Sequence, residues 1–162
     1  MSDQPAQGRW AIMLSLLAAL MLNIWPLPEM AQLLRPDWVA LVLIYWILAI
    51  PHRVNVGTAW LAGLVLDALT GSVLGQHALA LAVLALLVSG IHLRVRVFPV
   101  WQQAITVMAL LTVYEVILLM VEGATGQLHN LEWRWAPVLT GTLFWPWVLF
   151  LLRFLRRRFN VA

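Results

Sequence analysis

Two carboxylates lie inside long apolar stretches of the sequence, where a charged side chain is costly and is a candidate for function. Asp67 lies near the end of one such stretch and Glu115 lies deep within another. They could share a proton or face a common partner in a cavity. Two structural explanations stay open: Asp67 reaches interfacial water, and Glu115 pairs structurally within the helix bundle. Because no nucleophile accompanies the pair, the sequence predicts no enzymatic activity.

The segment GLVLDALTGSVLG, from Gly63 to Gly75, places Asp67 beside a turn. Its pattern predicts a helix that ends near the acid, a turn through Gly71 and Gly75, and a new helix that begins at His77. Glycines allow helices to approach closely and tolerate left-handed backbone conformations. A plain tight turn explains the same residues on local grounds.

Metal and cofactor chemistry finds no support in the sequence. Cysteine is absent from the chain, which removes thiolate catalysis, disulfides and cysteine-ligated metals. The histidines are scattered without the spacing that metal ligands need, at positions His52, His77, His92 and His129. No metal and no cofactor is therefore expected.

The elements that hold these side chains are predicted to be membrane-spanning helices. Hydrophobic residues make up 63% of the chain and charged residues 10%, against about 25% charged in soluble domains. The mean hydropathy of +0.89 agrees with a membrane protein. At about 20 residues per span, the 162 residues predict a single all-α transmembrane domain, residues 1–162, with spans near 10–25, 38–50, 54–69, 77–93, 101–121 and 137–152.

The second and third spans are short, so one broken segment is an alternative to a hairpin of two helices. The arginines favour two helices, because arginines near span ends collect on the cytoplasmic side. With six spans and both termini inside, Arg35 and Arg134 lie outside and eight of the ten basic residues lie inside. Fusing the two short spans would move Arg94 and Arg96 to the other side from Arg9. The arginines thus indicate orientation, and no nucleic-acid binding is expected.

The last predicted span has two further features. Pro146 lies in its middle and predicts a kink, which either packs within the bundle or opens a groove for a partner. The span is followed by a basic tail, which is expected to set topology and to contact anionic lipid; its members are Arg153, Arg156, Arg157 and Arg158.

Four ordered segments resemble the family of the rod shape-determining protein MreD, most closely its gammaproteobacterial members. They are RPDWVALVLIYWILAIPHRVNVG from Arg35 to Gly57, GLVLDALTGSVLG, WQQA from Trp101 to Ala104, and LFWPW from Leu143 to Trp147. The first segment supplies a loop motif made of Arg35, Pro36, Asp37, Trp38, His52 and Arg53. The resemblance covers Gly8 to Phe159 and marks Asp67 with its glycine turn as a family hallmark.

The resemblance implies a non-enzymatic component of the bacterial inner membrane that scaffolds or regulates lateral peptidoglycan synthesis. It implies MreC as the primary partner, with RodA, its penicillin-binding transpeptidase, RodZ and MreB in the same complex, and it allows a homodimer. RodA and the transpeptidase would perform the chemistry. On this view Asp67, Gly71 and Gly75 shape an outer-leaflet surface that engages MreC or the synthases.

A different class of function remains as the alternative. The chain also resembles in size and helix number the substrate-capturing subunit of energy-coupling-factor vitamin transporters. Asp67 and Glu115, both predicted in the outer half, would suit a ligand cavity as well as a groove for a partner helix. A membrane-embedded hydrolase would rest on these two carboxylates alone.

Overall fold

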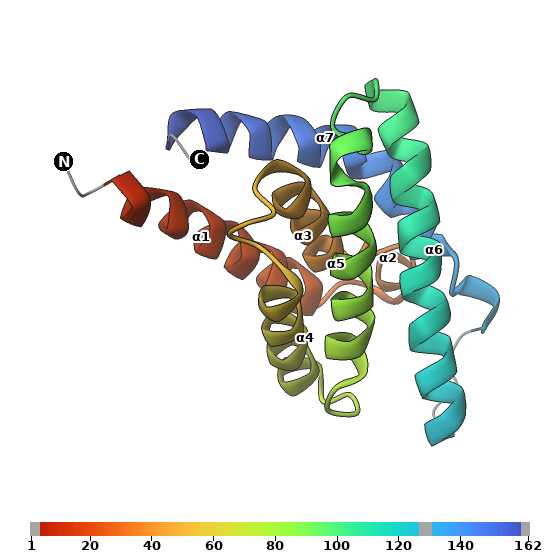
Figure 1. Cartoon of the computed structure of the whole chain (residues 1–162). Coiled ribbons are helices and arrows are strands. Elements are labelled where there is room, and N and C mark those ends of the chain that lie inside the picture. The colour runs from red at the N-terminus through yellow and green to blue at the C-terminus, as the bar shows by residue number, and fades with distance from the viewer. Residues whose placement is uncertain (1–3, 127–130, 160–162) are drawn as a thin grey trace.

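A computed structural model describes residues 4–126 and 131–159, with side chains from Gly8 onward. The described residues form helices and no strand (Figure 1). In residues 4–126 and 131–159, six longer helices are joined by a short helix and one turn of 3-10 helix. In chain order they are α1 Gln4–Ile24, α2 Glu29–Leu33, α3 Trp38–Ala49, α4 Val56–Thr70, α5 Gln76–Val95, α6 Val100–Thr125, η1 Leu131–Trp133 and α7 Ala136–Arg158.

Helix α3 forms the centre of the molecule. Every residue from Val39 to Leu48 is buried, and α1, α5 and α7 pack around it (Figure 1). A helix that is apolar on all faces is buried in protein or in lipid, and here the neighbouring helices enclose it. The Asp37 carboxylate caps its first turn by accepting from the Ala40 amide at 3.2 Å. The helix ends before Pro51, which disfavours helical backbone at Ile50.

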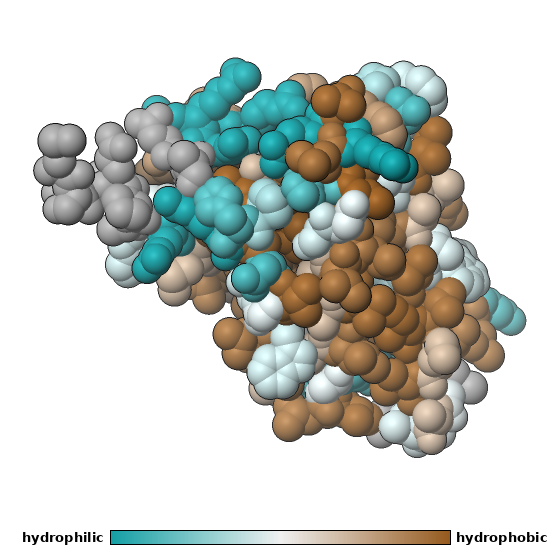
Figure 2. All heavy atoms as spheres, viewed as in Figure 1, coloured by the Kyte–Doolittle hydropathy of each residue, from teal (hydrophilic) through white to brown (hydrophobic). Residues whose placement is uncertain are grey.

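The helices run back and forth between two ends of opposite charge. The described acids lie at the end that contains the α4–α5 turn and the α6–α7 connection. Most arginines lie at the other end, with the α3–α4 and α5–α6 connections and the end of α7. In Figure 2 hydrophilic side chains cover this arginine-rich end, whereas apolar side chains cover α4, α5 and α6. We call the two ends the acidic end and the arginine-rich end.

The expectation of an all-helical chain with long apolar helices is confirmed. Within the described part of the chain, four segments are long and apolar enough to cross a membrane, at Glu29–Ala49, Gln76–Val95, Val100–Thr125 and Leu131–Arg158. The helices in 8–24 and 56–70 are apolar but shorter. Two separate helices, α3 and α4, occupy the region where one broken segment was the alternative.

Two helices continue beyond the predicted spans, and one helix lies outside them. Helix α6 continues to Thr125, so Glu122 belongs to its last turns and not to a connecting loop. Helix α7 continues to Arg158, so the predicted basic tail is helical. Helix α2 was not predicted from the sequence. The apolar pattern reports where a helix is buried, whereas backbone hydrogen bonding continues into polar turns beyond that region.

Candidate functional site

The Asp67 carboxylate organises the turn between α4 and α5. Its Oδ1 accepts from the Ser72 hydroxyl at 2.8 Å, the His77 amide at 3.0 Å and the His77 ring Nδ1 at 2.7 Å. Its Oδ2 accepts from the Gly75 amide at 2.9 Å and the Ala78 amide at 3.4 Å. Both oxygens are thus occupied by donors from the turn and from the first residues of α5.

The glycines of this turn have conformations that their sequence pattern indicated. Gly71 closes α4 with a φ of 70°, and Gly75 precedes α5 with a φ of 98°. Both lie in the left-handed region that favours glycine. Asp67 itself is only 1% exposed, so it does not reach interfacial water. The carboxylate is therefore buried under the turn and determines the shape of the turn's surface through its hydrogen bonds to the backbone.

Glu115 has a different partner. The Arg134 Nε atom lies 3.4 Å from Glu115 Oε2, and the Arg134 Nη1 atom also pairs with Glu122. Gln76 at the start of α5 donates to Glu122 Oε1 at 3.0 Å. One arginine before α7 thus joins two acids of α6. Asp67 and Glu115, the two candidate carboxylates, therefore have different partners.

Arg134 was missed as a site residue by sequence analysis, which treated it only as an outer-loop charge. A usable signal was present, because a carboxylate inside an apolar helix needs a cation. The sequence offers only Arg35 and Arg134 at that end of the bundle.

The predicted loop motif fastens the end of α1 to the start of α3. Arg35 donates through its two terminal nitrogens to the carbonyl oxygens of Asn23 and Trp25. The Asn23 side chain donates to Asp37 Oδ1 at 3.1 Å and accepts from the Trp38 amide at 2.9 Å. Asn23 was not predicted, because a single asparagine after an apolar run carries no distinguishing spacing.

A polar cavity of about 200 Å³ lies at the acidic end. It brings five predicted site residues together, and these are Arg35, Pro36, Asp37, His77 and Glu115. Cavities that bind drug-sized molecules have volumes of about 300–1,000 Å³. The smaller cavity at this end suits water or a single polar side chain of a partner better than a vitamin-sized ligand.

The remaining predicted site residues lie elsewhere. His52 and Arg53 lie between α3 and α4 at the arginine-rich end. Pro146 lies inside α7 next to the buried Trp145. The structure therefore divides the predicted loop motif, with its first four residues at the acidic end and its last two at the other.

An apolar groove of about 420 Å³ runs between α1 and α7 over the surface of α3. Its α1 wall contains small residues, Ser15, Ala18 and Ala19, and its α7 wall contains Leu151 and other large apolar residues. The Trp46 indole donates to the Ser15 hydroxyl at 2.8 Å and fixes α1 against α3. Sequence analysis did not predict this groove, because it depends on how two terminal helices are placed.

No group of three or more histidines and acids that could hold a metal is found in residues 4–126 and 131–159. His129, one of the four histidines considered above, lies outside the described residues. What the described polar residues do is hold helix ends together.

Comparison with known proteins identifies the family. The family model described as rod shape-determining protein MreD matches residues 4–155. The rod shape-determining protein MreD of Haemophilus influenzae is 35% identical over 154 residues, covering 93% of this chain and 93% of that protein. No solved structure matches the chain. The resemblance drawn from four sequence segments is thus confirmed, and the chain belongs to the family of the rod shape-determining protein MreD.

Proposed function

We propose that this protein is a non-enzymatic, multi-pass component of the bacterial inner membrane that scaffolds or regulates lateral peptidoglycan synthesis together with MreC. Family membership supports the role in cell shape. The carboxylates that sequence analysis singled out are bonded to the protein itself. Since these carboxylates already have partners within the protein, its function is assigned to its surface, through which it binds other membrane proteins.

The proposed topology has six membrane-spanning segments and both termini in the cytoplasm. The separation of acids and arginines between the two ends of the bundle supports it, because arginines are retained on the cytoplasmic side. Helix α3 has 12 residues, fewer than the about 20 that cross a bilayer. Since other helices enclose α3, it does not need to match the thickness of the lipid.

Topology reporters test this arrangement. Fusions at Gly71 and at Gln127, which lies outside the described residues, should report the periplasm. Fusions after Arg53 and Arg96 should report the cytoplasm, because these arginines follow α3 and α5 at the arginine-rich end. A cytoplasmic signal at Gly71 would contradict the six-span topology.

The groove between α1 and α7 is the proposed docking site for the single membrane-spanning helix of MreC. The groove is lined almost entirely by apolar side chains, as a contact inside the bilayer requires. Its small residues, Ser15, Ala18 and Ala19, allow a second helix to approach closely. RodA, its penicillin-binding transpeptidase, RodZ and MreB would join through other surfaces of the same complex.

Disulfide cross-linking tests the groove, and the chain is suited to it because it contains no cysteine. Ala18→Cys and Leu151→Cys should each form a disulfide with cysteines placed along the MreC helix. Leu86→Cys is the matched control, because Leu86 is exposed on α5 and does not line the groove. A disulfide requires Cα atoms within about 7 Å, so the control should remain unlinked.

Three results would count against this docking site. Equal cross-linking from all three positions would indicate random collisions in the membrane. Copurification of MreC with no cross-link from α1 or α7 would place the interface elsewhere. Recovery of lipid bound in the groove, with no MreC, would indicate that the groove binds acyl chains.

The ligand-capture alternative is less well supported. It requires a cavity for a vitamin-like molecule, and the polar cavity at the acidic end has a volume of about 200 Å³. Copurification distinguishes the two functions. Stable recovery with MreC favours the scaffold, and tight retention of a vitamin-like molecule favours transport.

A further inference from the structure

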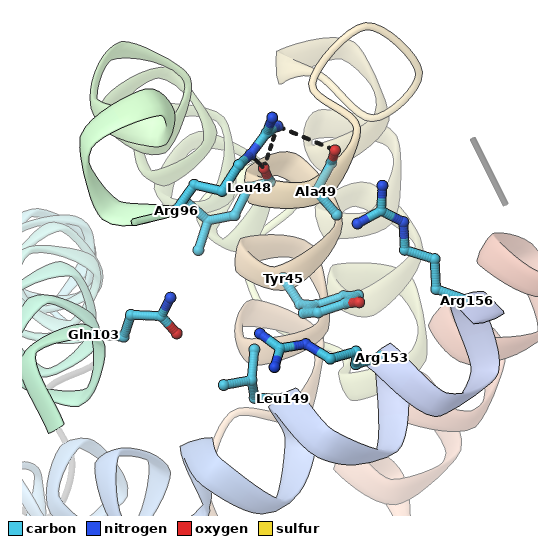
Figure 3. Close-up of a pocket in the computed structure, with 8 residues that line it drawn as sticks. All are labelled: Tyr45, Leu48, Ala49, Arg96, Gln103, Leu149, Arg153 and Arg156. Atoms are coloured by element: carbon cyan, nitrogen blue, oxygen red, sulfur yellow. Dashed lines mark hydrogen bonds between the residues drawn. The ribbon is translucent and has the colours of Figure 1, made fainter. Parts of the chain in front are cut away.

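A second polar cavity lies at the arginine-rich end, opposite the carboxylates. It has a volume of about 160 Å³ and lies between α3, α6 and α7 (Figure 3). Three arginines line it: Arg96 follows α5, and Arg153 and Arg156 extend from α7 toward Tyr45 of α3. Because Arg96 follows α5 whereas the other two arginines belong to α7, the cavity depends on the fold and is more than a basic stretch of sequence.

The positive charge of this cavity is not neutralised by the described residues. The acids of residues 4–126 and 131–159 all belong to the acidic end. Arg96 donates to the carbonyl oxygens of Leu48 at 2.7 Å and Ala49 at 3.1 Å, which cap α3 but carry no charge. Three guanidinium groups near one cavity without a carboxylate favour an anion there.

Arg153 is the arginine best placed to bind that anion. It lines the cavity, and it makes no hydrogen bond or ion pair within the described part of the chain. Arg156, in contrast, already forms a hydrogen bond with the Tyr45 side chain. A planar guanidinium presents paired donors that match the oxygens of a phosphate.

Gln103 adds a second and independent requirement. It is 5% exposed and belongs to the WQQA segment near the start of α6. Its Nε2 atom donates to the Val95 carbonyl at 3.1 Å, whereas its buried Oε1 atom has no donor among the described residues. A buried acceptor without a donor is costly, so the cavity suits an anion that also carries a hydrogen-bond donor.

We propose that this cavity binds the headgroup of an anionic phospholipid that carries free hydroxyl groups, such as phosphatidylglycerol. Arg153 and Arg156 would hold the phosphate diester, and a hydroxyl of the headgroup would donate to Gln103 Oε1. The volume of about 160 Å³ exceeds the about 10–15 Å³ that one water needs. Phe150 lies one turn before Arg153 on α7 and is exposed, so it offers apolar surface for the acyl chains.

Native mass spectrometry of the detergent-solubilised protein tests the proposal. The protein should retain phosphatidylglycerol in preference to zwitterionic phosphatidylcholine when both are supplied in equal amounts. Arg153→Gln should weaken retention about ten-fold or more, because it removes charge-assisted hydrogen bonds to the phosphate. Arg158→Gln is the matched control: it removes the same charge from the exposed end of α7 and should leave retention unchanged.

Two further comparisons identify the ligand. Phosphatidylmethanol, a phosphate diester of the same charge without headgroup hydroxyls, should bind more weakly than phosphatidylglycerol. Inorganic phosphate or glycerol phosphate that raises the unfolding temperature as much as the lipid does would overturn the lipid as the source of the anion. Equal losses in Arg153→Gln and Arg158→Gln would reduce the effect to general surface charge and would also overturn the site. Failure to retain any anionic lipid would leave the cavity to an acidic protein segment and would contradict the proposal.

Discussion

Gly63→Ala is expected to separate α4 from α5 and to remove most folded protein from the membrane. A Cβ atom at Gly63 would lie 2.3 Å from the Ala78 Cα atom and 2.5 Å from the Ala78 nitrogen. These are backbone atoms, so no side-chain rotation relieves the contact. The free energy of unfolding should fall by at least the about 1–3 kcal/mol that overpacking usually costs. Cells that depend on this variant should lose their rod shape.

Gly90→Ala is the control for this prediction. Gly90 lies in α5, its φ is not positive, and an added Cβ would meet nothing within 4 Å. Alanine favours helix over glycine by about 1 kcal/mol, so this variant should be as stable as the wild type or slightly more so. The measurements are the amount of protein in the membrane, its unfolding temperature in detergent, and cell shape. Equal stability of the two variants would contradict the close approach of α4 and α5.

The sequence was sufficient to predict the six longer helices of the described residues and their approximate limits, but not α2. Apolar runs interrupted by proline, glycine and arginine indicate where whole segments are removed from water, and each such segment forms a helix. The two glycines of the α4–α5 turn were predicted for the same local reason, since a left-handed residue has few alternatives to glycine. These features depend on residues close together in the chain.

Contacts between distant residues could not be predicted in the same way. The sequence suggested that Asp67 and Glu115 could face one partner. In the structure Asp67 pairs with His77, and Glu115 pairs with Arg134. Helix order alone does not determine which ends touch. The groove between α1 and α7 and the arginine cavity likewise depend on side chains from three or more helices. Only packing brings them together.

The Asp67 carboxylate makes both kinds of contact: its oxygens accept from the local turn and from the start of the next helix. All five atoms within hydrogen-bond distance of the carboxylate, which come from four residues, are donors when the His77 Nδ1 atom carries its proton. An asparagine at this position would keep the size of the side chain but would replace one acceptor oxygen with an amide group that donates. That amide would face backbone N–H groups, and the His77 ring would lose its anionic partner.

Asp67→Asn is therefore expected to destabilise the α4–α5 turn and to abolish rod shape. An amide that faces buried donors leaves them unsatisfied, which costs about 1–3 kcal/mol and should appear as a lower unfolding temperature in detergent. Glu132→Gln is the control, because it removes the same charge from an exposed position of η1.

Cell shape has to be measured beside the amount of protein in the membrane. Loss of shape together with loss of protein would assign Asp67 to the stability of the bundle. Loss of shape at a normal protein level would mean that the surface of the turn, held from beneath by Asp67, engages MreC or the synthases. Normal shape at a normal level would contradict both roles.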